Sequence, residues 1–315
     1  MLNYTYTVKF KKMKFLVSVM LVLGSFSVFA QPSDTLHAPK DKKAHDEVVV
    51  KMRSDFDNSM GKFSDLADAL PGKDTIKKID LSFRQLTDLP SELLEFTKLE
   101  ILDISHNKIT SLPQDFIKLK NLKELYIGSN NITNIDVLFK LKNIRIFRSD
   151  ENKINAISPN IKKWKKLNEL VFSGSSELPK SLWKLRKLET LRLWDGTLTQ
   201  LPPQIGKLKK LKTLCIRGNK VSELPKQVFT LKKLDYLSLT NNKFTTPPAG
   251  AEKLPVLTYL SIAQNPINEF SLDLSKMGKL EILACFGTGL NDAFWQDLAK
   301  KHPKIVVGYD ISKVH

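Results

Sequence analysis

The sequence predicts an α/β fold: a solenoid with a curved parallel sheet on its concave face and short helical or irregular segments on its convex face. The first observation is a phrase, L-x-x-L-x-L-x-x-N-x-L-x-x-L-P, that recurs about ten times at intervals of 21 to 23 residues. The second is the alternation inside the phrase, which has the period of a β-strand. The third is a hydrophobic content of 42%, enough for one continuous core along stacked copies. The copies begin at Ile76, Leu99, Leu122, Ile144, Leu167, Leu188, Leu211, Leu234, Leu257 and Leu280.

Residues 1–30 have the pattern of a secretory signal peptide. Four lysines precede an apolar run from Phe15 to Ala30, which ends in V-x-A. This pattern predicts cleavage between Ala30 and Gln31. The run has 16 residues, fewer than the roughly 20 that span a bilayer. We therefore expect an exported bacterial protein, periplasmic or secreted, with no transmembrane segment in the mature chain.

The segments between the signal and the repeats are predicted to be a tether and a cap. Residues 31–46 are polar and are expected to form a flexible tether. Residues 47–75 are expected to form an N-terminal cap, because an open solenoid end exposes its core to water. Phe63, Leu66 and Leu70 have helical spacing, so this cap is predicted to be helical.

The repeats are expected to occupy residues 76–293 and to end in a second cap. Residues 294–315 have the pattern of an amphipathic helix followed by a strand around Ile305–Val307. A helix and a strand together can cover the last repeat, so this segment is predicted to be the C-terminal cap.

Each part of the phrase has a physical role in a stack of copies. The leucines of L-x-L point to one side of a strand, where they share a core, and the residues between them point to the other side. The Leu-Pro pair opens the outer segment, because the fixed φ and missing N–H of proline suit a first helical turn. The Asn after the strand enters a tight turn, where its amide can satisfy buried backbone groups of neighbouring turns. This structural ladder is predicted at Asn107, Asn130, Asn152, Asn219, Asn242 and Asn265.

The phrase resembles that of the leucine-rich repeat family, in the 23-residue version that contains Leu-Pro. The resemblance is clearest in Leu99–Pro113 and Leu211–Pro225, and it covers Ile76 to about Ala293. It implies a curved solenoid, and it implies a partner on the concave face, where leucine-rich repeat proteins commonly bind. This version occurs in bacterial, animal and plant proteins with different roles, so the resemblance predicts the fold better than the function.

Catalysis has little support in the sequence. The five histidines lack metal-ligand spacing, and there is no phosphate loop or nucleophile elbow. Cys285 is expected in the core and Cys215 on the exposed side of a strand, as an incidental surface thiol. Three repeats separate their strands by roughly 14 Å, beyond the roughly 7 Å that a disulfide allows. We therefore expect that the protein is not an enzyme and that it binds no cofactor and no metal ion.

The residues between the strand leucines form columns on the concave face, where the core does not constrain them. Tyr, Trp and Arg dominate binding hot spots, and they recur in these columns. We therefore expect a protein ligand on this face. In the other interpretation, the rings only cover the sheet and stack on the arginines. The candidate ligand-binding residues are Tyr126, Arg148, Arg192, Trp194, Arg217, Tyr236 and Tyr259.

Three adjacent copies depart from the phrase. The fourth has Ser149 in place of a core leucine, the fifth has Ser175 at the Asn position, and the sixth has Gly196 there. We expect them to interrupt the ladder in two consecutive turns and to change the local curvature. Trp194 lies beside this interruption, which marks either a binding epitope or tolerated drift within a repeat array.

Lysines gather just before successive strands, and the formal net charge of the chain is +17. Stacking should align them as a basic edge. This edge is either a solvated surface that keeps the protein soluble or a surface for a polyanion, such as lipopolysaccharide or another acidic glycan of the envelope. We do not expect a nucleic-acid partner in an exported protein. The edge comprises Lys118, Lys120, Lys140, Lys142, residues 162–166, 184–187 and 207–210, Lys232 and Lys233.

These patterns favour an exported, non-enzymatic module that binds a protein through its concave face. The alternative is a module that binds the envelope or a polyanion through the lysine-rich edge. A third hypothesis is a purely structural surface protein or adhesin, which the small size of the chain disfavours. Salt should separate the first two, because binding to a polyanion weakens steeply as ionic strength rises.

Overall fold

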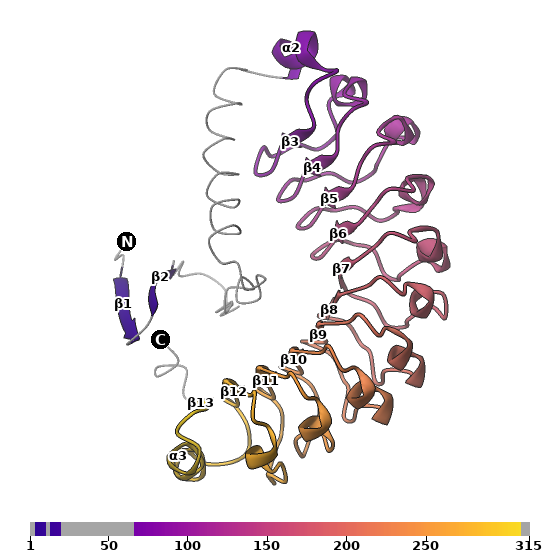
Figure 1. Ribbon diagram of the computed structural model, residues 1–315. Helices are drawn as coiled ribbons and strands as arrows, with labels where there is room; N and C mark the ends of the chain where they lie inside the picture. Colours follow the sequence, from indigo (N-terminus) through magenta and orange to yellow (C-terminus); the bar gives the residue numbers. More distant parts are fainter. Residues whose placement is uncertain (1–3, 11–12, 20–65, 310–315) are drawn as a thin grey trace.

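The computed structural model describes residues 4–10, 13–19 and 66–309, and the last range forms the arc of stacked repeats in Figure 1. Eleven strands line the inner side of the arc and pair in parallel, in one sheet that runs from β3 to β13 in chain order. The predicted solenoid with a parallel sheet is therefore confirmed. The strands are β3 (Lys78–Asp80), β4 (Ile101–Asp103), β5 (Glu124–Tyr126), β6 (Ile146–Arg148), β7 (Glu169–Ser173), β8 (Thr190–Trp194), β9 (Thr213–Cys215), β10 (Tyr236–Ser238), β11 (Tyr259–Ser261), β12 (Ile282–Ala284) and β13 (Val306–Gly308).

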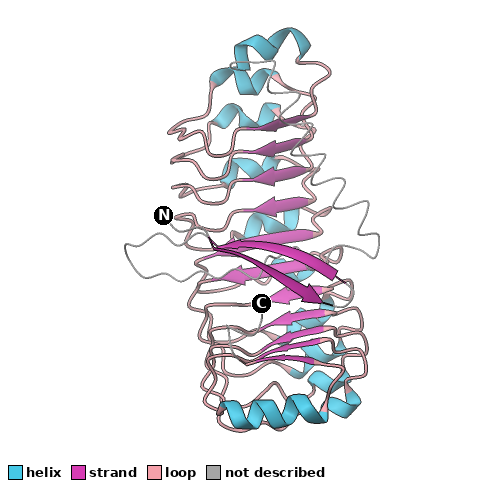
Figure 2. Ribbon diagram, turned by 90° about the vertical axis from the view of Figure 1, so that its left-hand side faces the viewer, coloured by secondary structure: helices cyan, strands magenta, loops and turns pink. Residues whose placement is uncertain are grey.

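Short 3-10 helices form the outer side of the arc, and Figure 2 shows them in cyan behind the magenta strands. Pro90, Pro113, Pro202 and Pro225 each directly precede one of these helices, as the Leu-Pro part of the phrase predicts. The outer helices are η2 (Ser91–Glu95), η3 (Gln114–Lys118), η4 (Asp136–Lys140), η5 (Pro159–Lys163), η6 (Leu182–Lys184), η7 (Pro203–Lys207), η8 (Lys226–Thr230), η9 (Ala251–Lys253) and η10 (Leu274–Lys276).

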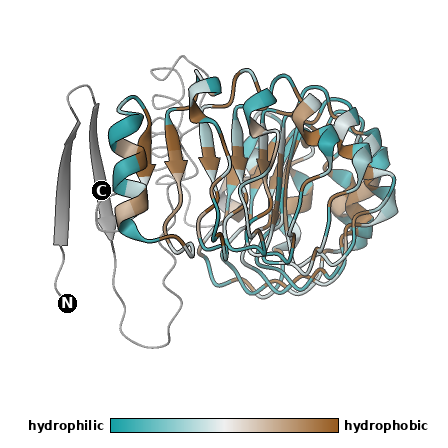
Figure 3. Cartoon of the chain, turned by 90° about the horizontal axis from the view of Figure 1, so that it is seen from below, coloured by the Kyte–Doolittle hydropathy of each residue, from teal (hydrophilic) through white to brown (hydrophobic). Residues whose placement is uncertain are grey.

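The core lies between the sheet and the outer helices. The first, fourth and sixth positions of the phrase are buried, as in Leu99, Leu102 and Ile104, which are all 0% exposed. Larger rings fill the wider outer part of the core. The Trp164 ring is fully buried, and its Nε1 donates to the Leu138 carbonyl oxygen at 3.2 Å. Figure 3 shows the strands in brown, because their central residues are hydrophobic.

Buried asparagines join successive turns. The Nδ2 of Asn242 donates to the carbonyl oxygens of Ile216, Leu239 and Thr240 at 2.9, 3.0 and 3.2 Å, and its Oδ1 accepts from the N–H of Val221 at 3.0 Å. Ile216 and Val221 belong to the preceding repeat, so one amide connects two copies. The other ladder residues make the same kind of bonds within their own turn and to the preceding copy; they are Asn107, Asn130, Asn152, Asn219 and Asn265.

The residue before the Asn position has a left-handed backbone in all ten copies. Its φ is 55° at His106 and 53° at Asn241, and glycine occupies the place in three copies. Outside glycine this conformation costs about 1 kcal/mol or more. Its N–H donates to the next repeat, for example from His106 to Gly128 at 2.9 Å and from Asn241 to Ala263 at 2.9 Å. The bonds between repeats therefore stabilise a turn that most side chains disfavour.

Both ends of the arc have helices. At the N-terminal end lie α2 (Leu66–Ala69) and η1 (Leu70–Gly72), and at the C-terminal end lies α3 (Asp292–Lys301). Asn291 caps α3, because its Oδ1 accepts from the Phe294 N–H at 2.9 Å. The helix begins two residues before the predicted boundary of the C-terminal cap. It precedes β13, which pairs with β12.

The N-terminal segment has only two described pieces, β1 (Tyr4–Phe10) and β2 (Met13–Val19), which pair in antiparallel fashion. Most of the expected signal peptide's apolar run, its cleavage point and the expected tether lie outside the described residues. Cleavage at Ala30 and a tether at 31–46 therefore stay predictions.

Replacing a ladder asparagine should destabilise the fold. Asn242→Ala removes three donated bonds and leaves the Val221 N–H buried without its acceptor, so we expect a loss of about 3 kcal/mol in the free energy of unfolding. Urea denaturation measures this loss. Asn155→Ala is the control, because Asn155 is exposed and its replacement should change the free energy by less than about 0.5 kcal/mol. Equal effects of the two substitutions would contradict the structural role of the ladder.

Candidate functional site

The concave face has three clusters of large side chains on consecutive strands. The strand register aligns the third residue of every strand in one column. Apart from Val171 on β7, the residues of this column are large or charged as far as β8, and they are small from β9 onward. In order, it contains Asp80, Asp103, Tyr126, Arg148, Val171, Arg192, Cys215, Ser238, Ser261, Ala284 and Gly308.

The first cluster lies on β5, β6 and β7. The guanidinium of Arg148 lies over the Tyr126 ring, 5.5 Å from its centroid, and its Nε donates to Oε1 of Glu169 at 2.6 Å. The Tyr126 hydroxyl donates to Oε2 of Glu124 at 2.9 Å. Burial and the nearby Glu124 carboxylate raise the pKa of Tyr126, so its hydroxyl stays a hydrogen-bond donor at neutral pH. The cluster presents an aromatic ring whose face is covered by an arginine and whose hydroxyl is bonded to one carboxylate, while a second carboxylate pairs with the arginine.

The second cluster lies on β8 and β9 and corrects one prediction. The Arg192 guanidinium lies 6.0 Å from the Trp194 ring centroid, and Trp194 Nε1 donates to the Cys215 sulfur at 3.2 Å. Arg192 is 8% exposed and Cys215 is 5% exposed. The prediction of Cys215 as a surface thiol is therefore wrong, because its small side chain lies below the larger side chains of neighbouring strands. Cys285 is fully buried in the core, as predicted.

The third cluster is a pair of tyrosines on β10 and β11. The rings of Tyr236 and Tyr259 stack with centroids 4.3 Å apart and an angle of 1° between their planes. Both side chains are half-buried, whereas the next column beside them holds the small, buried Ser238 and Ser261. The stacked rings therefore stand above the adjacent sheet surface.

Three aspartates on the concave side and in the following turns have raised pKa values. Burial is the main cause that raises the pKa of Asp103, Asp150 and Asp195. The Arg217 charge opposes this shift at Asp195. Arg217 is half-buried and lies in the same repeat as Cys215. Acidic groups thus lie close to the arginines that the sequence analysis selected.

The fifth and sixth copies, two of the three that depart from the phrase, contain the longest strands of the sheet. β7 and β8 pair over five residues, from Glu169 and Thr190 to Ser173 and Trp194, whereas the other neighbouring strands pair over three. The expected change in curvature stays a prediction; what the structure shows here is the longer pairing of β7 with β8.

Gly196 occupies a position without room for a side chain. A Cβ there would lie 2.3 Å from the carbonyl oxygen of Ser175 and 2.8 Å from Oδ1 of Asn219. A backbone bond joins the fifth and sixth copies at this point, since the Thr197 N–H donates to Ser175 O at 3.2 Å. The close approach of Ser175 and Asn219 therefore requires glycine at position 196, which is a structural reason for this departure from the phrase.

The predicted site residues lie on the same face but do not converge on one point. Tyr126 with Arg148, Arg192 with Trp194, and Tyr236 with Tyr259 are three separate pairs. The sequence analysis missed the left-handed position before the Asn and the Phe83–His106 stack on it, whose centroids are 4.1 Å apart. The glycine that occupies the left-handed position in three copies is the sequence feature that could have revealed it. Phe83 is 72% exposed and extends the concave rim toward the N-terminal end.

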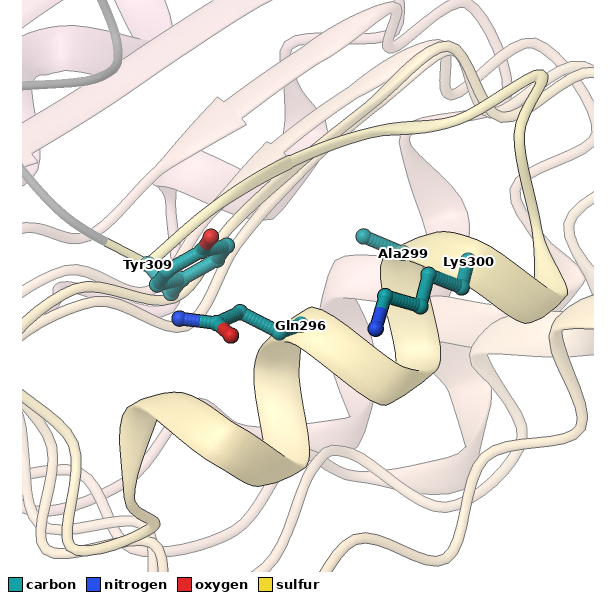
Figure 4. A pocket seen from close by; sticks show the side chains of 4 residues that line it. All are labelled: Gln296, Ala299, Lys300 and Tyr309. Carbon is teal, nitrogen blue, oxygen red and sulfur yellow. The ribbon is translucent and has the colours of Figure 1, made fainter.

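A shallow depression in the C-terminal cap lies apart from these clusters. Figure 4 shows Gln296, Ala299 and Lys300 of α3 facing Tyr309, which follows β13. These four lining residues include one charged group and no carboxylate, so they form no acid–base pair. Among the described residues, no three His, Cys, Asp or Glu side chains are grouped as metal ligands. No helix in the described ranges is both long enough and apolar enough for a membrane span.

Two family models match the chain and together cover most of the repeats. The model described as a leucine-rich repeat region matches residues 173–304, and the model described as a leucine-rich repeat matches residues 74–132 and 97–154. Comparison with curated protein sequences gives no significant match.

Solved structures of the same architecture come from bacteria and plants. A leucine-rich repeat protein of Leptospira interrogans has a TM-score of 0.52 at 19% identity, over 78% of this chain and 99% of that one. The functional domain of InlJ from Listeria monocytogenes has a TM-score of 0.59 at 21% identity, over 77% of this chain and 54% of that one. The plant peptide hormone receptor RGFR1, solved in complex with RGF2, has a TM-score of 0.52 at 25% identity, over 63% of this chain and 34% of that one.

Restoring the asparagine of the phrase at position 196 should destabilise the protein. Gly196→Asn forces a side chain against Ser175 and Asn219, so we expect a loss of about 2 kcal/mol in the free energy of unfolding. The same substitution at Gly278 is the matched control, since a Cβ there meets nothing within 4 Å. Urea unfolding of both variants checks this. A stabilising effect of Gly196→Asn would mean that the position is open and that its glycine is drift.

The Cys215 thiol should react slowly at pH 8 in the native protein. Burial raises the pKa of this thiol above its ordinary value, so little thiolate forms, and the thiolate is the reactive species. Trp194→Ala removes its neighbour, so we expect labelling by iodoacetamide to accelerate at least about tenfold. Peptide mass spectrometry measures the rate at each cysteine separately. Cys285, in the core three repeats away, serves as the internal control and should keep its rate; fast labelling of Cys215 in the native chain would contradict its burial.

Proposed function

Because the chain belongs to the leucine-rich repeat family, we propose that it is a non-enzymatic module that binds a protein through its concave sheet. The family and the fold are typical of scaffolds for protein interaction. Among proteins of similar structure, a plant peptide hormone receptor is solved in complex with RGF2. The proposal for this chain rests on its own concave residues.

The observation that carries the proposal is the line of paired large side chains across β5 to β11. Tyr126, Trp194, Tyr236 and Tyr259 are half-buried, so each ring has one part fixed against the sheet and another part open to a partner. Tyr and Trp supply much contact area with little loss of conformational freedom. Four such rings on one continuous sheet favour a contact that extends over several repeats.

The surface is held in shape before any partner arrives. Stacking fixes Tyr236 against Tyr259, and hydrogen bonds fix Tyr126 and Trp194. A partner then orders few side chains on this face, and the entropic cost of binding stays low. Arg192 is nearly buried and supports the Trp194 ring from one side, so we assign it a positioning role. The proposed contact residues are Tyr126, Arg148, Trp194, Arg217, Tyr236 and Tyr259.

The proposed setting is outside the cytoplasm. The lysines and apolar run of residues 1–30, with their V-x-A ending, support export and cleavage after Ala30. The binding itself requires no covalent step, so recognition depends on shape, aromatic contact and the arginine and carboxylate pairs.

Removing the rings should weaken capture of the partner. The protein is used as bait on envelope extract and culture fluid of the producing cell, beside a variant with Trp194→Ala, Tyr236→Ala and Tyr259→Ala. We expect the native bait to hold one protein through high salt, and the variant to bind it at least about tenfold more weakly, because central aromatic residues carry most of an interface's energy. Biolayer interferometry with the captured protein measures the affinities.

The matched control replaces an exposed apolar side chain outside the strands, Val256→Ala, which is 38% exposed in the native chain. This control should bind as the native protein does, and thermal unfolding should show all three baits folded. If the ring variant holds the same protein with unchanged affinity, the concave site is wrong.

A further inference from the structure

We propose that the outer segments of four consecutive repeats form a docking surface for a membrane that carries anionic lipid headgroups. These segments are residues 159–168, 179–188, 202–211 and 225–234, and we call their solvent side the cationic face. The helices of these segments lie on the outer side of the arc, away from the concave clusters, and the turns that follow them lead back to the strands. The proposal is thus independent of the protein partner proposed above.

The charge of the four segments has one sign. They contain four, four, three and three Lys or Arg residues, and they contain no Asp or Glu. The corresponding segments of the other repeats mix both signs: residues 90–99 have two glutamates and one lysine, and residues 113–122 have one aspartate and two lysines. A surface that only maintains solubility interleaves the two signs. The absence of acidic residues is confined to the middle of the arc.

The fold brings these cations together and exposes them. The helices η5, η6, η7 and η8 follow one another along the outer side of the arc in Figure 1. All fourteen Lys and Arg residues of the four segments are exposed. Within the described part of the chain, no ion pair joins any of them to a carboxylate. Three instead donate to uncharged groups, among them Lys166 to Asn143 Oδ1 at 2.7 Å.

Buried side chains hold the cationic face in place. Trp164, Trp183, Ile205 and Val228 of the same segments are at most 3% exposed and anchor them to the core. The face is therefore a rigid backbone surface with long, flexible, charged side chains on its outer side. This arrangement keeps many like charges within reach of one partner.

The chemistry of the face fits lipid headgroups better than a nucleic acid or a glycan. Thirteen of its fourteen cations are lysines, which act as point charges without the planar fork that recognises one fixed phosphate. Its aromatic rings, Trp164, Trp183 and Phe229, are buried, so the face offers no stacking platform for bases. Many weak point charges suit mobile phosphates spread over a surface.

The position of the face also fits a planar partner. The outside of an arc meets a plane near its middle, and the cationic face occupies the fourth to seventh of ten repeats. The concave clusters then remain open on the other side. A protein held in this way keeps its partner-binding surface directed away from the lipid.

Vesicle binding tests the proposal. The mature chain, residues 31–315, is mixed with phosphatidylcholine vesicles in which one third of the lipid is phosphatidylglycerol, and with vesicles of phosphatidylcholine alone; sedimentation gives the partition coefficients. We expect binding to the anionic vesicles that weakens steeply as salt rises. The variant with Lys163→Gln, Lys166→Gln, Lys187→Gln and Lys210→Gln should partition at least about tenfold more weakly.

A charge-matched control distinguishes the face from net charge. It carries Lys98→Gln, Lys220→Gln, Lys243→Gln and Lys279→Gln, which replace exposed lysines outside the four segments. It should partition within about twofold of the native chain. An equal loss in both variants, or no preference of the native chain for anionic vesicles, overturns the proposal. Salt-sensitive binding to heparin or duplex DNA without vesicle binding also overturns it and assigns the face to a soluble polyanion.

Discussion

The fold depends on satisfying the backbone of a tight turn that water does not reach. Each ladder amide bonds three carbonyl oxygens and at least one N–H, and it does so across two copies, as Asn242 does between Ile216 and Thr240. The same turn carries a residue with positive φ, whose N–H donates to the next copy. These bonds fix the distance between neighbouring strands at the inner edge of the arc. This distance sets the spacing of the aromatic and charged residues on the concave face. The geometry of the candidate site therefore depends on the turn.

The two sides of a repeat use that scaffold differently. On the concave side, side chains contact one another across strands, as in the stack of Tyr236 on Tyr259 and the ion pair of Arg148 with Glu169. The surface is therefore preformed, and its charges are largely compensated locally. On the outer side of the middle repeats, exposed lysines have no acidic neighbours within their segments. One side is suited to a specific contact with a shaped partner and the other to a diffuse contact with many negative charges.

The repeat phrase predicted much of this architecture because its period is repeated ten times and each position has one dominant physical role. Stacking, the buried leucines and the proline starts follow from it. What it did not predict are effects between neighbouring copies. Cys215 has the position of an exposed residue, yet larger neighbours cover it. Gly196 resembles a lost asparagine, yet the carbonyl of Ser175 occupies the space. Arg192 is of a residue type that dominates binding hot spots, yet it is nearly buried. Such outcomes depend on the volumes of the side chains in adjacent strands, and the repeat phrase of one copy carries no information about these volumes.

The central claim is that a partner covers the concave rings. Hydroxyl-radical footprinting of the protein, free and bound to its captured partner, tests it directly, because oxidation of each aromatic side chain reports its access to solvent. The account predicts that binding lowers the oxidation of Trp194, Tyr236 and Tyr259 while Val256, in the turn before β11, keeps its rate. Unchanged oxidation of the three rings, with protection of outer residues instead, would contradict it.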